Sequence, residues 1–433
     1  MQILIYTEKT SPRMTYILDE LLRERMGLEY EVVTDKQDYL QSPLPGICYG
    51  VTRVREDNEI HVPAAGLVLE NEVKKVMPEV SVFEKIPVLF PVHGNGDFPF
   101  DIFSAVFYML SRYEEYLPFE EDEYGRFPAA LSLAHRNDFL EVPVVDHWTL
   151  MLERKLITVC PGLSFREKEY HFLPTFDVDQ VFAVKDKPVI RFLGSALKAG
   201  DFSARWKIRR GLEKDPFDTF GLIRSIHEPL GLKPFFFFHT GKWGKFDKSM
   251  FPEKESVRQV IRDCDTWGRV GLHPSYRSHD EPELLRWEKE RLEKALGRTV
   301  TASRQHFIRL RFPETYRRLL AVGISDDYSM GFPELPGFRA GTSRPFRWFD
   351  LQRNETTGLT VYPFAVMDGV LKKKYGSKGD EILRFLGVLK QKVKNTGGWF
   401  VQLWHNHTLS DWDDWQGWKH IYEEWLGKAI YRK

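Results

Sequence analysis

The sequence predicts an α/β protein in which a distorted (β/α) barrel of about seven strands follows a smaller α/β domain. From His171 onward, short apolar runs alternate with helical segments, which is typical of repeated β/α units. The chain has 433 residues, and domains commonly hold about 100 to 200 residues, so a separate first unit is expected. We therefore expect an N-terminal domain over residues 1–165 and a barrel with a tryptophan-rich C-terminal helix over residues 166–433.

The composition excludes several classes of protein. Hydrophobic residues make up 42% of the chain, which excludes disorder or a coiled coil as its main structure. The 62 Lys and Arg balance the 62 Asp and Glu, so no overall positive field favours nucleic acid. The three cysteines encode no disulfide framework, and no apolar run reaches the roughly 18 residues of a membrane span. We therefore expect a cytoplasmic protein without a membrane span.

The first 165 residues predict alternating strands and helices. In the stretch 102–116, apolar residues recur at helical spacing, and Asp101 stands where an N-cap is expected. No catalytic group of residues is recognisable in this region. The expected strands are Ile3–Tyr6, Tyr30–Thr34, Gly66–Leu69 and Val88–Pro91, and the expected helices are Arg13–Arg25 and Ile102–Tyr116.

Seven apolar runs are candidate strands of the barrel. Barrel and open-sheet α/β enzymes place their sites at the carboxyl ends of such strands. Polar residues that follow these runs are therefore the candidate functional residues. The runs are Phe172–Phe176, Pro234–Phe238, Val270–Leu272, Val300–Ser303, Val322–Ser325, Leu359–Pro363 and Trp399–Trp404.

Two carboxylates end the first of these runs, in the segment Thr175–Asp179. Side chains two residues apart on a strand point the same way, so Asp177 and Asp179 should face one pocket. Two like charges in one pocket are costly unless a cation or a shared proton relieves them. One carboxylate could therefore bind a metal while the other acts as a base. A solvated strand end is the alternative, and the same Asp-x-Asp pattern also suits a nucleotide-sugar glycosyltransferase.

Histidines and an arginine follow later strands. His273 comes directly after a short apolar run, and neutral imidazole commonly joins a carboxylate around a divalent metal. If the segment Arg304–Phe307 is a strand, Arg304 and His306 share one face. An arginine there can hold a nearby carboxylate in place and keep it ionised.

Three more polar residues complete the pattern. Asp327 follows the fifth run, and Arg339 lies in the segment Gly337–Thr342, so both could orient a histidine or the base. His405 ends the last apolar run and could serve as a general acid. Each residue alone is also compatible with a structural role. Their occurrence at successive strand ends favours a catalytic site.

The order and spacing of these motifs resemble the polysaccharide deacetylase family, the NodB-homology carbohydrate esterases, over roughly residues 170–410. The resemblance implies a distorted (β/α) barrel that removes N- or O-acetyl groups from polysaccharides with a zinc-like divalent metal. The stretch Phe107–Pro118 resembles an N-terminal domain attached to some bacterial deacetylases. The segments that carry the family resemblance are Thr175–Asp179, Pro234–Phe238, the stretch from His273, Arg304–Phe307, Asp326–Asp327 and Leu403–His405.

The resemblance also implies individual roles. Asp177 would be the base, Asp179 and His273 would bind the metal, and His405 would protonate the leaving group. The family's second metal histidine usually follows the first by four or five residues, but position 277 is Arg. His306 shares a strand face with Arg304, which matches a pocket arginine of the family, so His306 is favoured as the third ligand, and His279, on a longer loop, is its rival.

The sequence thus predicts a metal-dependent hydrolase that removes acetyl groups from a polysaccharide or sugar precursor. Zinc is the favoured metal, with cobalt, nickel or iron as alternatives, and the partner is an acetylated carbohydrate. Tyr276, Trp404 and Trp412 could line a cleft for this sugar. Two other functions remain open: a metal-dependent glycosyltransferase, and a non-catalytic carbohydrate-binding or assembly protein.

Overall fold

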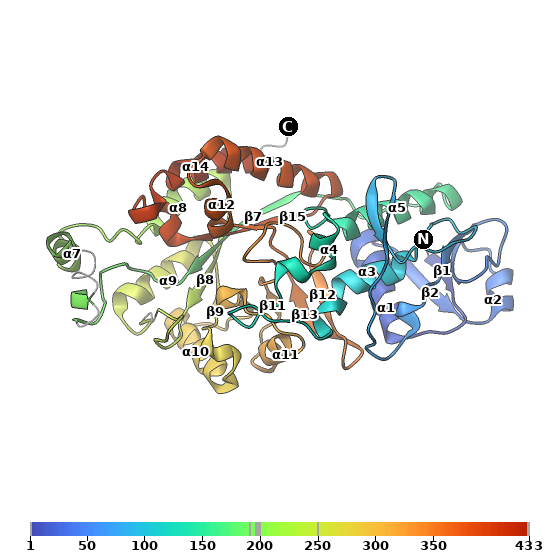
Figure 1. The fold of residues 1–433 in the computed structure, drawn as a ribbon, viewed down its shortest axis with the longest axis horizontal. Coiled ribbons are helices and arrows are strands. Elements are labelled where there is room, and N and C mark those ends of the chain that lie inside the picture. The colour runs from blue at the N-terminus through green and yellow to red at the C-terminus, as the bar shows by residue number, and fades with distance from the viewer. Residues whose placement is uncertain (1, 190–191, 195–200, 249–250, 431–433) are drawn as a thin grey trace.

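The computed structural model describes residues 2–189, 192–194, 201–248 and 251–430. In these ranges the chain forms mixed α/β structure, with one sheet near the N-terminus and a larger one in the remainder (Figure 1). The first sheet is parallel, and a separate antiparallel pair follows it. In spatial order the sheet holds β2 (Glu29–Val33), β1 (Gln2–Tyr6), β3 (Gly46–Gly50) and β4 (Glu59–Pro63), and the pair is β5 (Val80–Phe83) with β6 (Ile86–Leu89).

Helices pack against this first sheet. Asp101 caps α3, as expected, because its carboxylate accepts the N–H of Ser104 at 2.9 Å. The strand expected at Gly66–Leu69 is wrong: Gly66 has a left-handed φ of 97° and starts a short 3₁₀ turn over Leu67–Leu69. The helices are α1 (Pro12–Leu18), continued by a π-helical stretch (Asp19–Met26), α2 (Lys36–Gln41), α3 (Ile102–Leu110), α4 (Leu133–Arg136) and α5 (Val144–Val159).

The larger sheet has nine strands in the order β12-β13-β11-β10-β9-β8-β7-β15-β14. Its pairs are parallel except β12 with β13, which is antiparallel. The strands are β7 (His171–Val178), β8 (Phe235–His239), β9 (Arg269–His273), β10 (Ala302–Ser303), β11 (Asp326–Asp327), β12 (Phe346–Asp350), β13 (Glu355–Val361), β14 (Val366–Met367) and β15 (Trp399–His405).

The α/β class of the prediction is confirmed, but the strands of the described residues do not close into the expected distorted barrel of about seven strands, because their sheet is open. One edge is β12, which turns back against β13, and the other is the two-residue β14, so the two edges do not pair. Neither edge strand was expected from the sequence. Six of the seven expected runs overlap a strand, while Val322–Ser325 lies directly before β11.

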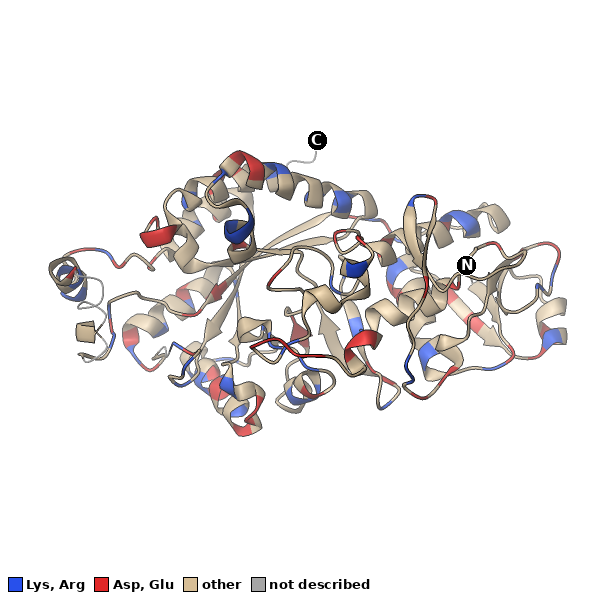
Figure 2. Ribbon diagram, viewed as in Figure 1, with Lys and Arg blue, Asp and Glu red and all other residues tan. Residues whose placement is uncertain are grey.

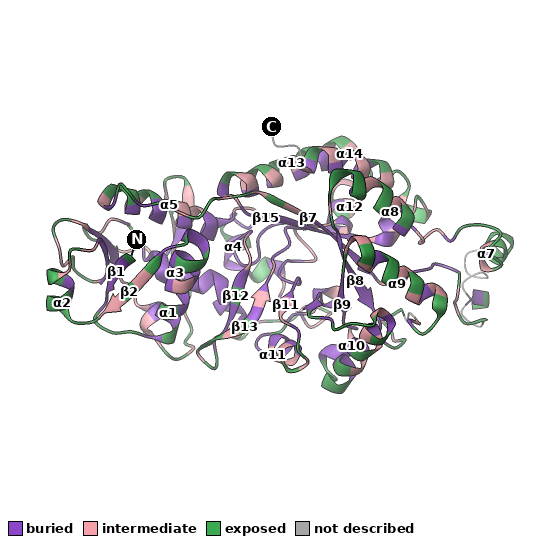
Figure 3. Ribbon diagram, turned by 180° about the vertical axis from the view of Figure 1, so that it is seen from behind, coloured by how far each residue is buried: buried purple, intermediate pink, exposed green. Residues whose placement is uncertain are grey.

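Helices cover the outer face of the larger sheet (Figure 1). Along β8, Phe236 and Phe238 pack into the main core, while Phe235 and Phe237 belong to a second apolar cluster on the opposite, inner face. The sheet is therefore buried on both faces, and Figure 3 shows its central strands in purple. The helices of this part of the chain are α7 (Phe202–Arg209), which lies apart from the sheet at the left of Figure 1, α8 (Phe220–His227), α9 (Glu255–Trp267), α10 (Pro282–Leu296), α11 (Glu314–Ala321), α12 (Asp368–Tyr375), α13 (Gly379–Thr396) and α14 (Trp418–Ile430).

The C-terminal tryptophans mainly build the core. Trp404 is 1% exposed, packs edge-on against Trp418, and donates its indole N–H to Gln402. Its expected place in a sugar cleft is therefore wrong, because no face of the ring is open to a ligand. Trp412 is half-buried against Phe217.

Hydrogen bonds connect the N-terminal part of the chain with the remainder. The domain boundary near residue 165 stays a prediction. The hydroxyl of Tyr16 donates to the carbonyl of Arg347 at 2.7 Å, and the carboxylate of Asp146 accepts the N–H of Ser343 at 2.8 Å. Figure 2 shows acidic and basic residues interspersed along the ribbon. Within the described ranges, every helix is either too short or too polar to cross a lipid bilayer.

Candidate functional site

Polar side chains gather on the inner face of the larger sheet, at the carboxyl ends of its strands. Leu173 on β7 and Leu403 on β15 belong to the apolar cluster on the inner face. Because every second residue of a strand points to the same face, Asp177 and His405 also lie on the inner face. These two residues are register partners on the neighbouring strands β7 and β15. In the same way the face of Phe237 continues to His239, whose register partner is His273 on β9.

Asp179, His273 and His306 form a group whose ligand atoms all lie within 4.8 Å of one another. Asp179 Oδ1 lies 3.3 Å from His273 Nε2 and 3.5 Å from His306 Nε2. This oxygen is buried and has no hydrogen-bond partner in the part of the chain that the structure describes. Two imidazole nitrogens and one carboxylate oxygen directed at one point suit a divalent metal such as zinc.

The Nδ1 atoms of the two histidines are held by acceptors. His273 Nδ1 lies 2.6 Å from the carbonyl of Arg304, and His306 Nδ1 lies 3.1 Å from Asp247 Oδ1. An Nδ1–H donated to such an acceptor leaves the Nε2 lone pair free, which is the usual arrangement of histidines that bind a metal. Both Nε2 atoms face Asp179, so the tautomer with its proton on Nδ1 would let each histidine bind a metal through Nε2.

Asp247 is a residue that the sequence did not predict. It lies after β8 in a stretch without regular helix or strand, so no periodic pattern marks it. Its Oδ1 also accepts the N–H of Tyr276 at 2.7 Å. Together with His239 and His306 it forms a second buried group of possible metal ligands, which shares His306 with the first.

His306 lies beside Asp179, but not for the expected reason. β10 ends at Ser303, and His306 begins a 3₁₀ turn rather than lying on a strand. The next residue, Phe307, has a φ of 58°, so Arg304–Phe307 cannot be a regular strand. The N–H of His306 donates to the carbonyl of Pro274 at 3.2 Å, which keeps the turn against the loop that follows β9.

The rival ligand His279 lies in a different environment. It ends a 3₁₀ turn (Arg277–His279), and its Nδ1 lies 3.4 Å from the hydroxyl oxygen of Thr315. Burial, with help from the nearby Arg309, lowers its pKa to about 4. His279 belongs to neither of the two ligand groups found among the described residues.

Arg304 holds Asp177 beside the first ligand group. Its Nη1 donates to Asp177 Oδ1 at 3.0 Å and to the hydroxyl oxygen of Thr175 at 2.6 Å. The guanidinium lies over the ring of Phe237, with its carbon 4.6 Å from the ring centroid. The other carboxylate oxygen, Asp177 Oδ2, lies 3.7 Å from His273 Nε2. Asp177 is thus fixed with one oxygen on the arginine and the other facing the ligand group.

His405 is paired with Asp368, a second residue that the sequence did not predict. The Nδ1 of His405 lies 2.9 Å from Asp368 Oδ1, and its backbone N–H donates to Asp368 Oδ2 at 2.8 Å. Burial lowers the pKa of His405, but the Asp368 carboxylate outweighs burial and raises it to about 10. Burial and the neighbouring His405 lower the pKa of His407 to about 4. His405 is therefore the protonated member of this histidine pair at neutral pH.

Asp327 lies within a hydrogen-bond network. Its carboxylate accepts the hydroxyls of Tyr316 at 3.0 Å and Ser303 at 3.1 Å and the N–H of Ser329 at 2.9 Å. Burial raises its pKa to about 6. None of its hydrogen bonds with described residues involves a histidine, so the expected orienting role is not supported.

Arg339 is held by Glu115. Its Nε donates to Glu115 Oε1 at 2.9 Å, and its Nη1 donates to the carbonyl of Gly331 at 3.1 Å. Both hydrogen bonds are buried, and Glu115 belongs to the first part of the chain. Among the described residues its hydrogen bonds reach neither a histidine nor Asp177, so its charge pairs with Glu115, and a role in orienting a histidine or the base stays a prediction.

Comparison with known proteins finds one matching family model and several similar solved structures. A family of unknown function, DUF7033, matches residues 3–161, which is less than half of the chain. A putative polysaccharide deacetylase from Mycobacterium smegmatis is 13% identical, with a TM-score of 0.42, over 63% of this chain and 87% of that one. Puue allantoinase is 12% identical, with a TM-score of 0.41, over 72% of this chain and 91% of that one.

A third structure is a CE4 family pseudoenzyme from Bacillus anthracis, which is 14% identical, with a TM-score of 0.30, over 60% of each chain. No curated protein matches the sequence significantly. Because these identities and TM-scores are low, the likenesses do not establish a function, and the site itself has to support one.

Proposed function

We propose that the protein is a metal-dependent hydrolase that removes acetyl groups from a polysaccharide or a sugar precursor. The observation that carries this proposal is the position of Asp177, which Arg304 holds at 3.0 Å beside the Asp179, His273 and His306 group. A carboxylate base next to three ligands for a metal is the arrangement that acyl hydrolysis needs.

Asp179, His273 and His306 would hold the metal. Three protein ligands leave further positions open, which is typical of catalytic rather than structural zinc. When bound, the metal would polarise the acetyl carbonyl and lower the pKa of a water molecule. The side chain of Asp179 is 24% exposed, whereas that of His273 is 2% exposed, so the group opens to solvent on the aspartate side.

The remaining residues would move protons. Asp177 would accept the proton of the attacking water, because the hydrogen bond from Arg304 fixes the direction of this carboxylate. His405 would donate a proton to the leaving nitrogen or oxygen. The Asp368 carboxylate supports this role, because it keeps the imidazole protonated at neutral pH.

The two other functions receive less support. A glycosyltransferase of the Asp-x-Asp type would direct both carboxylates at a metal-nucleotide, but Asp177 Oδ1 is already bound by Arg304. A non-catalytic protein would have no need for a protonated His405 beside Asp177. The hydrolase is therefore the function that the described side chains support best.

Metal content and acetate release test the proposal together. We expect the purified protein to take up about one zinc, cobalt or nickel ion per chain and to release acetate from N- or O-acetylated oligosaccharides. Asp179→Ala should lose both properties, because two ligands hold a divalent metal weakly. A metal-loaded protein that releases no acetate and binds a nucleotide sugar would favour the glycosyltransferase. Failure to take up any metal would favour the non-catalytic protein.

A further inference from the structure

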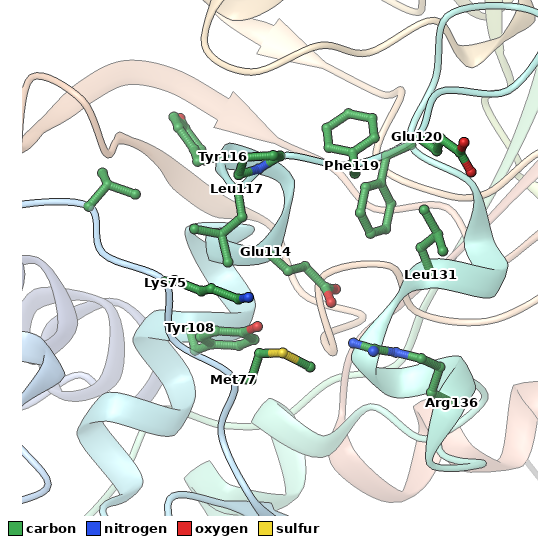
Figure 4. Close-up of a pocket in the computed structure, with 13 residues that line it drawn as sticks. Lys75, Met77, Tyr108, Glu114, Tyr116, Leu117, Phe119, Glu120, Leu131 and Arg136 are labelled. Carbon is green, nitrogen blue, oxygen red and sulfur yellow. The ribbon is translucent and has the colours of Figure 1, made fainter.

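A cleft of about 980 Å³ lies in the first part of the chain, and none of its lining residues belongs to the site described above (Figure 4). Its walls are mainly apolar and aromatic. Protein sites for small molecules commonly have volumes of about 300 to 1,000 Å³, so the cleft is large enough for one organic ligand. The main apolar lining residues are Tyr108, Tyr116, Leu117, Phe119, Phe127 and Leu131.

The walls of the cleft are held in place by contacts of their own. One wall is the extended stretch 73–77, which is tied to the body because the hydroxyl of Tyr113 contacts the N–H of Lys74 at 2.8 Å and its carbonyl at 2.9 Å. On the opposite wall, the rings of Phe119 and Phe127 pack edge to face with centroids 4.9 Å apart. The cleft is therefore formed before any ligand binds.

Two basic side chains reach the cleft without a carboxylate partner. Figure 4 shows the ends of Lys75 and Arg136 directed toward the same region as the carboxylate of Glu114. Glu114 is already occupied, because Oε1 pairs with Arg112 at 2.8 Å and Oε2 accepts the N–H of Leu133 at 2.7 Å. Neither Lys75 nor Arg136 forms an ion pair within the ranges that the structure describes. Glu120, the other carboxylate of the lining, is exposed, and Figure 4 shows it at the far end of the cleft from Lys75 and Arg136. The region between Lys75 and Arg136 therefore carries a net positive charge beside the apolar wall.

The hydroxyl of Tyr108 adds a hydrogen-bond donor to the cleft. The side chain is 3% exposed, and Figure 4 shows its hydroxyl group at the wall between Lys75 and Met77. Burial, helped by the nearby Glu114, raises the pKa of Tyr108 above its ordinary value, so the hydroxyl keeps its proton at physiological pH. A donor and two cations around an aromatic wall complement a ligand that carries a negative charge on a flat apolar body.

We propose that this cleft binds a small soluble aromatic anion, with its ring system against Phe119, Phe127 and Leu131 and its charged group between Lys75 and Arg136. The proposal does not rest on the hydrolase function, because it uses no residue of the metal-ligand group. Carboxylate, sulfonate and phosphate all satisfy the charge requirement. A neutral aromatic molecule of the same size would use the apolar wall alone.

Two fluorescent probes that share one ring system test this proposal. 8-Anilinonaphthalene-1-sulfonate carries one negative charge, and N-phenyl-1-naphthylamine has the same aromatic body without it. We expect the sulfonate to bind the full-length protein at one saturable site, about tenfold or more tighter than the neutral probe. Its affinity should fall as salt is raised, because exposed charges are screened. Equal affinity for both probes, or no saturable binding of either, would overturn the proposal.

Variants locate the binding in the cleft. Lys75→Gln and Arg136→Gln should each weaken sulfonate binding about threefold to fivefold, as expected for one partly exposed charge pair, and should leave the neutral probe unchanged. Leu131→Trp should fill the cleft and weaken both probes, and Met77→Trp serves the same purpose if that variant does not fold. Lys36→Gln is the matched control, because Lys36 is an exposed cation of α2 outside the cleft. Unchanged sulfonate binding in Arg136→Gln and Leu131→Trp would show that the probe binds elsewhere and would refute the proposal.

Discussion

Asp247 Oδ1 lies 3.1 Å from His306 Nδ1, and this contact fixes which nitrogen of the imidazole faces Asp179. A carboxylate that accepts Nδ1–H holds the ring in one tautomer and makes Nε2 a better metal ligand. Asp247 is itself fixed by the N–H of Tyr276, so the orientation of His306 depends on the chain after β8 and the loop after β9. The proposed metal site therefore needs support from residues outside the ligand group.

Asp247→Ala should weaken zinc binding about tenfold to 100-fold, because loss of such a supporting carboxylate commonly has that effect. Asp179→Ala should abolish tight binding instead. Competition titration with a chromogenic chelator measures both affinities. Asp280→Asn is the control, because Asp280 is 61% exposed and pairs only with Arg309 among the residues described. If Asp247→Ala binds zinc as tightly as the wild type, His306 does not depend on Asp247.

His306→Ala should weaken zinc binding far more than His279→Ala. His306 Nε2 lies 3.5 Å from Asp179 Oδ1, whereas His279 contacts Thr315 and belongs to no ligand group among the described residues. The same titration compares both variants. A normal affinity in His306→Ala together with a large loss in His279→Ala would make His279 the third ligand.

The convergence of several site residues could be predicted from the sequence, because it follows from period two on parallel strands. Asp177 and His405 continue inner faces of their strands, and the strand ends meet at one edge. The position of His306 could not be derived in this way. It depends on a turn with a positive φ at Phe307, and neither a phenylalanine nor its neighbours signal such a turn.

Asp177→Asn should leave zinc binding nearly unchanged and lower the rate of acetate release about 100-fold to 10,000-fold. The amide has nearly the same shape as the carboxylate but cannot accept the proton of the attacking water. Parallel measurements of metal content and of acetate release separate the two effects. Full activity in this variant would place the base on another residue, and loss of the metal would make Asp177 a ligand.

Asp368→Asn should move the alkaline limit of activity to lower pH. Burial alone would lower the pKa of His405, and the charge of Asp368, with smaller contributions from Asp179 and Asp177, raises it to about 10. Without the largest of these contributions the pKa of His405 should fall, and the imidazole should lose its proton at a lower pH than in the wild type. The pH dependence of kcat in both proteins measures this shift. An alkaline limit that stays in place would mean that His405 does not donate the proton.

The pairing of His405 with Asp368 should also make the stability of the protein depend on pH. The folded-state pKa of His405 is raised above its unfolded value, so its contribution is fully present below about pH 6.5 and is lost as the pH rises through about 10. The difference in melting temperature between the wild type and Asp368→Asn should therefore be largest near pH 6 and should shrink toward pH 10. A difference that does not change with pH would contradict the assigned protonation state.

Asp368 and Asp247 were missed for a physical reason. Asp368 follows β14, which has only two residues, and the apolar residues Phe364–Met367 before it directly continue the expected run Leu359–Pro363, so they do not mark a separate strand. The open edges of the sheet were not predicted either. A pattern of repeated β/α units predicts parallel strands only, whereas β12 pairs with β13 in the antiparallel direction. Local patterns indicate strands that are long and apolar, whereas short strands and loops acquire their places only through tertiary contacts.

Arg339→Gln should lower the stability of the protein rather than act on the chemistry of the site. Arg339 is 1% exposed and pairs with Glu115, which Arg112 also contacts at 2.7 Å. Removal of one partner from a buried ion pair leaves a charge poorly compensated, which costs about 3 kcal/mol or more of unfolding free energy. Urea unfolding measures this loss, and acetate release per folded molecule should remain close to that of the wild type. The double variant Arg339→Gln/Glu115→Gln should recover part of the lost stability, because it no longer buries an unpaired carboxylate. If Arg339→Gln is as stable as the wild type but has lost most of its activity, Arg339 belongs to the catalytic machinery after all.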